Sequence, residues 1–584
     1  MKILVITNLF PNNKEPNRGV FNKQQMTELA KLCEVKVIAP VAWHRAKGIL
    51  YEEKIEGLKV YHPRYFMIPK IGRSLYGFFF YFGIIGKIKK IYEIFKFDMI
   101  LATWAYPDGF GAALVSHALK KPLVIKVHGS DVNIASQYFL RRKMMVYAFK
   151  RAQKIIAVSN ALKEKIISLG ILDKKIEVIP NGIDTELFKP MDKVECRKKL
   201  SLPLDKKIVL YAGNLEKVKG IDILVEAMKG LPEDIYLVVV GNGRLKGKLD
   251  RIASAYGLAM TFIDAKPHYE IPLWMNAADV FCLPSRNEGC PNVVLEALAC
   301  GTPIAASRVG GIPEIIDSKE KGILVAAGAI SELSDGINKA LEKKWDKGIL
   351  RQSVLNYDWT ENARRVSEAL AGIDLYVRPN KIKNIIKEYI ALIIPKKYII
   401  WHGNRHRGLN RVALTFDDGP NPAYTPKILD ILDKYGVKAT FFLVGQEVEK
   451  HRELAKRIFR EGHLIGNHSY SHKGFGALDS REMENEILRT QNVLIDTFGK
   501  NGRLFRPPQG ALNFKCWSAA RKHEFNTVFW SWESGKTNLD LIKPGDIMLF
   551  HDDNDFTLEA LPGIIEKLNN KNFQFVTIED LIKD

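Results

Sequence analysis

The 584-residue chain lacks any cysteine pattern that could form a metal finger or a disulfide framework. Its six cysteines are scattered along the sequence, and no two of them are spaced as Cys-x-x-Cys. Such an arrangement is typical of unpaired thiols in a reducing compartment. We therefore exclude a small disulfide-stapled protein and a zinc-finger protein.

A long hydrophobic run is also missing. The longest apolar stretch, residues 76–86, is much shorter than the roughly 20 residues that a membrane-spanning helix needs. Residues 1–7 are apolar, but they are too short for a signal peptide and are not followed by a small-residue cleavage site. We expect these residues to form a first β-strand and the protein to be cytoplasmic.

Acidic residues are outnumbered by basic ones, 66 against 87, which gives a net charge of +21. This charge suits anionic partners such as nucleotide diphosphates or lipid phosphates, and it equally fits a solvated lysine-rich surface. No recognition motif for nucleic acid accompanies it, so we do not expect that partner. An apolar content of 46% is ordinary for a folded protein, and the length exceeds what one core can hold.

Short β-branched runs alternate with amphipathic stretches through the first 372 residues, in two series. The first series comprises residues 35–39, 99–102, 123–127, 155–158 and 176–179. The second comprises residues 208–212, 237–240, 280–283 and 304–306. Because such runs are typical of buried parallel strands, two successive series predict an α/β protein with two doubly wound, Rossmann-like domains facing a cleft.

A third α/β pattern begins near residue 411, with strands expected at 412–416, 440–444 and 464–466. Five polar motifs follow in order: TFDDGP at 415–420, GNHSYSH at 466–472, RPPQG at 506–510, WSWE at 530–533 and LFHD at 549–552. An aspartate and two histidines four residues apart can supply three metal ligands and leave a position open for water. A neighbouring aspartate can act as base and a distant histidine as acid.

In order and spacing these motifs resemble the polysaccharide deacetylase family, the NodB-type carbohydrate esterases, over about the last 175 residues. The resemblance implies a distorted (β/α) barrel that binds a divalent ion, with zinc favoured and cobalt or nickel also compatible. The implied metal ligands are Asp418, His468 and His472. The ion would polarise the acetamide carbonyl and activate bound water.

The resemblance also implies roles for residues around the ion. Asp417 would deprotonate the water, and Arg506 would orient the Asp417 carboxylate. His551 would protonate the departing amine, and the backbone N–H of Gln509 would help to hold the tetrahedral oxyanion.

The fourth motif departs from the family pattern of two aspartates three residues apart, the second followed by tryptophan. Here Glu533 is followed at those positions by Lys536 and Thr537, and Gln509 replaces a common aromatic residue. Two interpretations stay open. We favour an active deacetylase with an altered acceptor pocket, and the alternative is a catalytically inactive, carbohydrate-binding module.

In the first part of the chain, two glutamates are separated by seven residues in EGCPNVVLE at 288–296, directly before a helical stretch. VIPNGID at 178–184, LYAGN at 210–214 and VGGIPE at 309–314 accompany them. Together these motifs resemble family 4 of the retaining glycosyltransferases over residues 1–373. The resemblance implies transfer of a hexose or N-acetylhexosamine from a UDP- or GDP-sugar that binds between two domains, without a required cofactor.

By this resemblance, Glu296 would hold the ribose hydroxyls and Glu288 would contact the donor sugar. Lys219 would neutralise the diphosphate, and the loop containing Gly19 would let the backbone approach the phosphates. His128, within KVHGS, would lie near the transferred sugar.

One position departs from the family pattern. Asn214 stands where the family usually has an arginine that contacts the diphosphate, although we still expect Asn214 at the nucleotide-sugar site. Lys217 is a candidate to replace the missing cation.

We expect four segments. Residues 1–184 form the acceptor domain, completed by a crossing helix near 357–373, and residues 185–356 form the nucleotide-sugar domain. A basic amphipathic linker spans 374–410 and a deacetylase domain spans 411–584. The basic-aromatic residues 381–410 fit either a docking helix, which we favour, or a segment on an anionic membrane. Residues 65–90 fit either a core helix with a charged end, which we favour, or a membrane contact.

These observations together predict a bifunctional enzyme of surface-glycan biosynthesis. One half would transfer a sugar to a glycan or lipid-linked acceptor with retention of configuration, and the other would remove an acetyl group from an N-acetylated sugar. Fusion would raise the local concentration of the intermediate. We expect the enzyme on the cytoplasmic side, with peripheral contact to the inner face of the cell membrane as an option.

Overall fold

A computed structural model describes residues 1–67, 73–375, 398–403, 409–475, 478–500, 502–510, 514–533 and 539–583. The chain separates into two compact units, Met1–Pro379 and Asn380–Asp584. The first unit holds two large sheets, and the second unit holds a third sheet.

The first sheet has eight strands, and all of its strand pairs are parallel except β4 with β5. In spatial order they are β10 (Ile176–Val178), β9 (Lys154–Ala157), β8 (Leu123–Val127), β7 (Met99–Ala102), β1 (Lys2–Ile6), β2 (Glu34–Ile38), β5 (Leu58–Tyr61) and β4 (Glu52–Ile55). The inner strands are continuous apolar runs because helices cover both faces of a parallel sheet. Ile3 through Ile6 of β1, for example, are fully buried.

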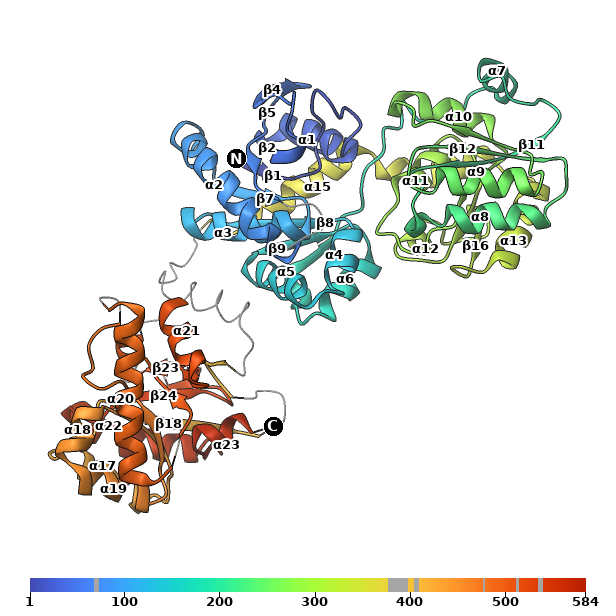
Figure 1. Cartoon of the computed structure of the whole chain (residues 1–584). Coiled ribbons are helices and arrows are strands. Elements are labelled where there is room, and N and C mark those ends of the chain that lie inside the picture. Colours follow the sequence, from blue (N-terminus) through green and yellow to red (C-terminus); the bar gives the residue numbers. More distant parts are fainter. Residues whose placement is uncertain are drawn as a thin grey trace. The chain divides into compact units, whose positions relative to one another are not determined.

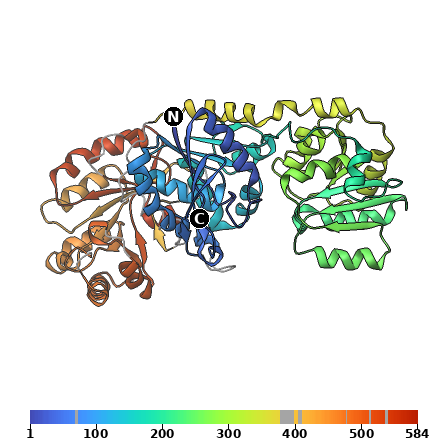
Figure 2. The same ribbon diagram turned by 90° about the horizontal axis from the view of Figure 1, so that it is seen from above.

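The second sheet has six parallel strands. In spatial order they are β13 (Met260–Ile263), β12 (Ile235–Val240), β11 (Lys207–Ala212), β14 (Val280–Leu283), β15 (Ile304–Ser307) and β16 (Gly322–Val325). Numbered along the chain this is the order 3-2-1-4-5-6 of a doubly wound sheet, whose ligand site lies where the order reverses. Figure 2 shows helices on both sides of this green sheet.

The first unit contains these α-helices: α1 (Val20–Leu32), α2 (Tyr76–Phe95), α3 (Phe110–Leu119), α4 (Ser130–Ala135), α5 (Phe139–Arg151), α6 (Asn160–Ile167), α7 (Lys193–Lys199), α8 (Ile221–Ala227), α9 (Lys246–Ala255), α10 (Ile271–Ala277), α11 (Asn292–Ala299), α12 (Ile312–Ile315), α13 (Ile330–Glu342), α14 (Lys347–Gln352) and α15 (Trp359–Ala371).

Helix α15 follows the second sheet in sequence but packs on the first, where the yellow helix lies among the blue elements of Figure 1. Its buried residues Ala363 and Val366 join the core formed by α1 and strand β1. Asp358 caps its first turn by accepting a hydrogen bond from the Glu361 N–H at 3.0 Å. Gly182 makes room for it, because a Cβ at Gly182 would lie 2.5 Å from the Trp359 ring.

The third sheet is curled, parallel and open. Its strands in order are β17 (Ile399–Ile400), β22 (Asn526–Val528), β21 (Leu504–Phe505), β20 (Leu464–Asn467), β19 (Thr440–Leu443), β18 (Arg411–Asp417), β24 (Ile547–His551) and β23 (Trp532–Glu533), and β25 (Gln574–Phe575) pairs with β18. Its helices are α17 (Thr425–Lys434), α18 (Gly445–Lys450), α19 (Arg452–Arg460), α20 (Ser480–Phe498), α21 (Phe514–Lys522), α22 (Asp555–Asn569) and α23 (Ile578–Ile582). An apolar core centred on Phe416, Phe441 and Phe550 fills the space between strands and helices.

The predicted fold class is confirmed, with two doubly wound sheets followed by a curled α/β sheet. The strands predicted at 99–102, 123–127 and 280–283 have those bounds, and the others differ by one or two residues. The differences arise because strand ends are set by hydrogen-bonded pairing, which an apolar run indicates only approximately.

The structure describes the two basic-aromatic segments, residues 65–90 and 381–410, to different extents. Helix α2 buries one face, including Phe80 and Ile84, and leaves Phe82 69% and Ile94 83% exposed. Most of the linker, residues 376–397, lies outside the described residues, but Ile399–Ile400 pair with β22 and Trp401 stacks on Phe529. Over the described ranges, no helix combines the length and apolar character needed to cross a membrane.

All six cysteines are buried free thiols.

Candidate active sites

A cavity of about 640 Å³ lies between loops of the first and second sheets. Gly19 and His128 line it from the first sheet, and Lys219, Glu288 and Glu296 line it from the second. Gly19 is the left-handed residue before α1, where a Cβ would come 2.4 Å from the Leu9 carbonyl oxygen, so only glycine fits this turn. Five of the six predicted donor-site residues therefore meet in one cleft.

Two glycines bring the His128 loop against the Glu288 loop. A Cβ on Gly129 would lie 2.5 Å from the Gly289 Cα, and a Cβ on Gly289 would lie 1.9 Å from the His128 carbonyl oxygen. Any larger residue would force the two backbones apart. The close approach is what keeps His128 and Glu288 on the same cleft.

Glu288 is buried at the base of this cleft and is held by two partners. The Lys219 ammonium donates to both carboxylate oxygens at 2.8 and 2.9 Å, and the Ser285 hydroxyl donates to one of them at 2.7 Å. A buried carboxylate needs such compensation, because an unpaired charge would carry a large desolvation penalty. Lys219 is about one third exposed, so its ammonium also faces the cavity.

Glu296 extends from the second turn of α11 and pairs with a residue that the motifs did not indicate. Its Oε1 lies 2.9 Å from Nε2 of His268, which also lines the cleft. Burial works against a charge on His268, but the Glu296 carboxylate outweighs it and raises the His268 pKa. No sequence signal links these residues, since they lie 28 positions apart in different elements.

His128 presents a neutral ring to the cleft. Burial, assisted by the nearby Lys126 ammonium, holds the pKa of His128 well below its ordinary value. Among the described residues, neither ring nitrogen has a hydrogen-bond partner. Burial also lowers the pKa of Lys126 to about 7, and its ammonium donates to Asn181 at 2.9 Å.

Asn214 differs from the other predicted donor-site residues. It is exposed, its carbonyl accepts a hydrogen bond from the Tyr211 hydroxyl, and it is not among the residues that line the cleft. Lys217 is also outside this lining, whereas Lys266 is part of it.

The second candidate site lies at the carboxyl ends of strands in the third sheet. Asp417 ends β18, His551 ends the adjacent β24, and the two residues are direct register partners. His468 follows β20 and Arg506 follows β21. Because all of these strands are parallel, their carboxyl ends meet at one edge and bring the motifs together.

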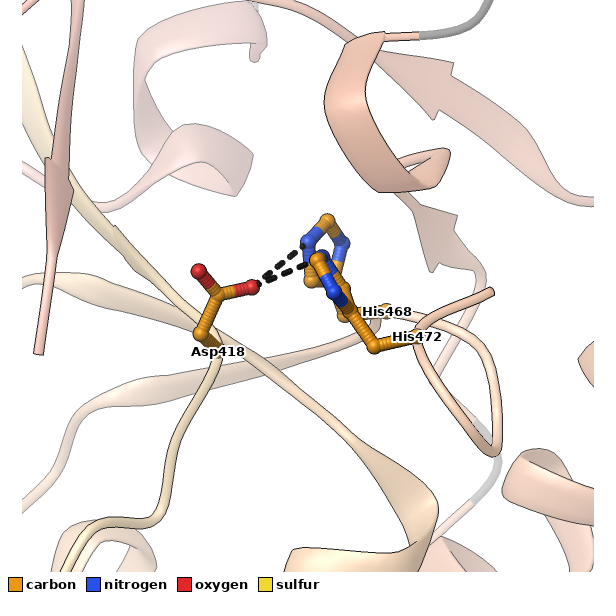
Figure 3. A group of neighbouring side chains, drawn as sticks. All are labelled: Asp418, His468 and His472. Carbon is orange, nitrogen blue, oxygen red and sulfur yellow. Dashed lines mark ion pairs between the residues drawn. The ribbon is translucent and has the colours of Figure 1, made fainter. Parts of the chain in front are cut away.

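Asp418, His468 and His472 form a cluster that could hold a metal ion (Figure 3). Oδ1 of Asp418 lies 3.3 Å from Nε2 of His468 and 2.9 Å from Nε2 of His472, and all three ligand atoms lie within 4.8 Å of one another. Burial raises the pKa of Asp418, but the contacts with both histidines outweigh it and leave the pKa well below its ordinary range.

The tautomer of His468 fits a metal ligand. Its Nδ1 lies 2.7 Å from the Arg506 carbonyl oxygen, which can only accept, so Nδ1–H donates and the Nε2 lone pair is left for an ion. Asp418 and His472 both have positive φ values, 79° and 53°, which aspartate and histidine tolerate only at some cost. Two nitrogens and one carboxylate oxygen suit zinc and leave a fourth position open.

Asp417 is fixed by a fully buried arginine. Nη1 of Arg506 donates to Oδ1 of Asp417 at 2.6 Å and to the Thr415 hydroxyl at 2.8 Å. Removing either charge would leave its partner buried and unpaired, which costs roughly 3–5 kcal/mol in comparable pairs. The pair therefore fixes the Asp417 carboxylate beside the metal cluster, where its Oδ2 lies 3.7 Å from Nε2 of His468.

Four further residues were discussed for this site, and the structure describes two of them, Gln509 and Glu533. Gln509 has a left-handed φ of 56° in the turn Pro508–Gly510, and its side chain lies against Gly474. Glu533 lies in β23, next to β24. Lys536 and Thr537 fall outside the described residues.

Glu486 was not indicated by the motifs, yet it holds the loop between the two histidines. From α20 its carboxylate accepts hydrogen bonds from the Tyr470 N–H at 3.0 Å, the Ser471 N–H at 2.8 Å and the Ser471 hydroxyl at 2.8 Å. The contact joins residues about 15 positions apart and has no local sequence signature. It fixes the backbone from which His472 extends.

Three families match this chain in consecutive segments. Glycosyltransferase Family 4 matches residues 19–187, Glycosyl transferases group 1 matches residues 192–366, and Polysaccharide deacetylase matches residues 404–528. The two resemblances found in the sequence are confirmed.

Curated relatives cover the same two parts. TuaC of Bacillus subtilis, named as a teichuronic acid biosynthesis glycosyltransferase, is 34% identical over 358 residues, which are 58% of this chain and 89% of TuaC. A peptidoglycan-N-acetylglucosamine deacetylase of Bacillus cereus is 34% identical over 205 residues, 32% of this chain and 95% of that protein. The crystal structure of Anabaena Alr3699/HepE in complex with UDP shares the fold, with a TM-score of 0.51, 21% identity and coverage of 64% of this chain and 100% of that one.

Replacing Glu486 with glutamine should weaken divalent-ion binding by roughly 10- to 100-fold, the usual effect of losing a residue that orients a ligand. The physical reason is that an amide cannot accept all three hydrogen bonds, so the loop carrying His472 loosens. Isothermal titration with zinc would measure it, with the exposed Glu482→Gln on the same helix as the matched control. Unchanged zinc affinity in a folded Glu486→Gln protein would contradict this role.

Proposed function

Because the chain belongs to the glycosyltransferases (Glycosyltransferase Family 4 over residues 19–187, Glycosyl transferases group 1 over residues 192–366) and to the polysaccharide deacetylases over residues 404–528, we propose that it is a bifunctional enzyme of cell-surface glycan biosynthesis. One part transfers a sugar from a UDP- or GDP-sugar to a glycan or lipid-linked saccharide with retention of configuration. The other part removes the acetyl group from an N-acetylated sugar with the help of a divalent metal.

The observation that carries the transfer proposal is the shared cleft of Gly19, His128, Lys219, Glu288 and Glu296. In this proposal the Glu296 carboxylate accepts from the ribose hydroxyls, and His268 keeps that carboxylate oriented. Lys219 turns from Glu288 towards the diphosphate, which offers a stronger anionic partner. Glu288 is thereby released to hold the donor sugar.

The deacetylation proposal rests on the alignment of Asp417 and His551 beside the Asp418–His468–His472 cluster. Those three residues would hold zinc, or cobalt or nickel, and the bound ion would supply Lewis-acid polarisation of the amide. Asp417, oriented by Arg506, takes the proton from water. His551 gives a proton to the departing amine, and the Gln509 backbone N–H stabilises the developing oxyanion.

A peripheral contact with anionic membrane is part of the proposal, because a lipid-linked acceptor resides there. Helix α2 supports it with exposed Phe82 and Ile94 near Lys87, Lys89 and Lys90. Apolar side chains beside cations suit the interface of an anionic bilayer.

Glu288→Gln should reduce sugar transfer by roughly a hundredfold or more, because the donor sugar loses a buried charged partner. Acetate release from a supplied N-acetylated acceptor should stay unchanged. Both activities would be measured on the same preparations, with the exposed Glu320→Gln as the matched control. Parallel loss of both activities in a folded protein would mean that the two sites are not independent.

His468→Ala should remove a metal that the wild type binds at about one ion per chain, whereas Asp417→Asn should keep the metal and still lose acetate release by roughly 10²–10⁴-fold. The contrast follows because His468 is a ligand and Asp417 is a base. Elemental analysis and an acetate assay would test it. Near-normal acetate release by Asp417→Asn would refute the base assignment, and a metal-loaded wild type without deacetylase activity would favour the carbohydrate-binding module.

The protein should cosediment with vesicles containing anionic lipid at low salt and dissociate towards 1 M salt, where the screening length falls to roughly 3 Å. The double variant Lys89→Ser/Lys90→Ser should bind less, because it removes two cations beside the exposed apolar residues. Lys198→Ser/Lys199→Ser in α7 removes the same charge elsewhere and should bind normally. Equal binding by both double variants would argue against a contact through α2.

A further inference from the structure

The loop between β1 and α1, residues 7–19, separates two cavities. One side of the loop contributes Leu9, Asn17 and Gly19 to the large cleft. The other side contributes to a second, smaller cavity, which we call the side cavity. Its polar lining is formed by Asn8, Asn12, Glu15, Arg18, Arg45, His62 and Tyr65. His62 is paired with Glu53 through Nε2 at 2.7 Å. The side cavity is therefore one loop away from the expected donor site.

The side cavity carries a net positive charge. Nη1 of Arg18 lies 3.1 Å from one Glu15 oxygen, and Nη2 of Arg45 lies 3.4 Å from the other. One carboxylate is thus shared by two guanidinium groups, each of which has five N–H donors. Arg18 is also fixed by donating through Nε to the Asn8 carbonyl at 3.0 Å. One positive charge and several donors are left for a ligand.

The carboxyl group beneath this cavity does not cancel that charge. Asp108 is fully buried, and its Oδ2 accepts a hydrogen bond from the Asn8 N–H at 2.6 Å. Burial, with a smaller contribution from Asp131, raises the pKa of Asp108 to about 8. Burial therefore opposes a negative charge on this group.

An exposed aromatic patch adjoins the side cavity. We define it as Trp43, Phe66, Phe79 and Phe82. Trp43 and Phe66 stack with ring centres 6.2 Å apart, Phe66 meets Phe79 edge-on at 5.4 Å, and Phe82 lies one turn further along α2. Trp43, Phe66 and Phe82 are 55%, 50% and 69% exposed. Exposed apolar patches of this kind mark binding sites.

The patch and the cavity share an edge. The Trp43 indole N–H donates at 3.0 Å to the carbonyl of Met67, and Met67 itself lines the side cavity. Arg45 follows Trp43 by two residues in the same short 3₁₀ turn, Trp43–Arg45. Cationic donors and exposed aromatic rings are therefore presented side by side.

We propose that the side cavity binds the phosphate of a lipid-linked acceptor and that the aromatic patch contacts the first part of its hydrocarbon chain. This inference rests on the proposed transferase function and assigns a chemical class to its acceptor. The cavity volume, about 50 Å³, is several times the ~10–15 Å³ that one water needs. It has room for a group of the size of a phosphate.

The charge and the apolar surface together favour an amphiphile over a free glycan. A neutral saccharide would leave unmatched the one positive charge that Glu15 does not offset, whereas a guanidinium fork matches phosphate oxygens. A free phosphate or nucleotide would leave the exposed rings unused. A phosphate held here also leaves the attached saccharide one loop away from the donor cleft, where transfer requires it.

Calorimetric titration of the full-length protein with three probes would test the inference: farnesyl phosphate, farnesol and inorganic phosphate, each below its aggregation limit. Farnesyl phosphate should bind at least about tenfold more tightly than farnesol or inorganic phosphate. Its phosphate pairs with the cations of the side cavity, and its hydrocarbon chain contacts the aromatic patch. Equal affinity for farnesyl phosphate and farnesol would overturn the phosphate assignment. Equal affinity for farnesyl phosphate and inorganic phosphate would overturn the assignment of the patch.

Variants separate the two parts of the site. Arg45→Ala should weaken farnesyl phosphate by roughly tenfold and leave farnesol unchanged, because it removes only a charged contact. Trp43→Ser should weaken both farnesyl ligands and leave inorganic phosphate unchanged. The matched control is Lys47→Ala, which removes an exposed positive charge two residues beyond Arg45 and outside the cavity lining. An equal loss of farnesyl phosphate affinity in Lys47→Ala would overturn the proposal.

Titration with UDP and GDP distinguishes this inference from the transferase proposal on which it rests. Arg45→Ala should bind the nucleotide as the wild type does, because Arg45 does not line the large cleft. A wild type that binds neither nucleotide would count against the transferase proposal, while the farnesyl phosphate measurements would still decide what the side cavity binds. Loss of nucleotide binding in a folded Arg45→Ala protein would overturn the separation of the two cavities.

Discussion

The shared direction of the strands is the constraint on which the rest of this structure depends. In all three sheets, the loops that carry polar motifs follow the carboxyl ends of parallel strands, which meet at one edge of each sheet. Asp417 and His551 are 134 positions apart, yet they become neighbours because β18 and β24 pair in register. The same rule brings the loops after β1 and β8 to one cleft with those after β11 and β14.

In each site, buried carboxylates are paired with basic side chains. Glu288 is paired with Lys219, Glu296 with His268, and Asp417 with Arg506. These pairs contribute little net stability, since desolvation offsets much of their attraction. Their consequence is positional, because each buried carboxylate is held in one orientation. A ligand that competes for one partner, as a diphosphate would for Lys219, can redirect the other.

The backbone conformation of the loops also determines the geometry of both sites. Gly129 and Gly289 let two loops touch where any Cβ would collide, and Gly19 allows the left-handed turn before α1. At the other site Asp418 and His472 adopt positive φ values despite having side chains. Strain of this kind persists only where the surroundings hold it, and Glu486 does so for the His472 loop.

The sequence by itself determined the fold class, most strand positions, both families and the motifs that carry the site residues, because apolar periodicity and motif spacing are local properties. It did not reveal that His268 pairs with Glu296, that Glu486 supports the His472 loop, or that Asn214 stays outside the cleft lining. Only the tertiary structure decided these points. Side-chain partners between distant elements depend on how helices and loops pack against the sheets, and no local pattern in the chain encodes that packing.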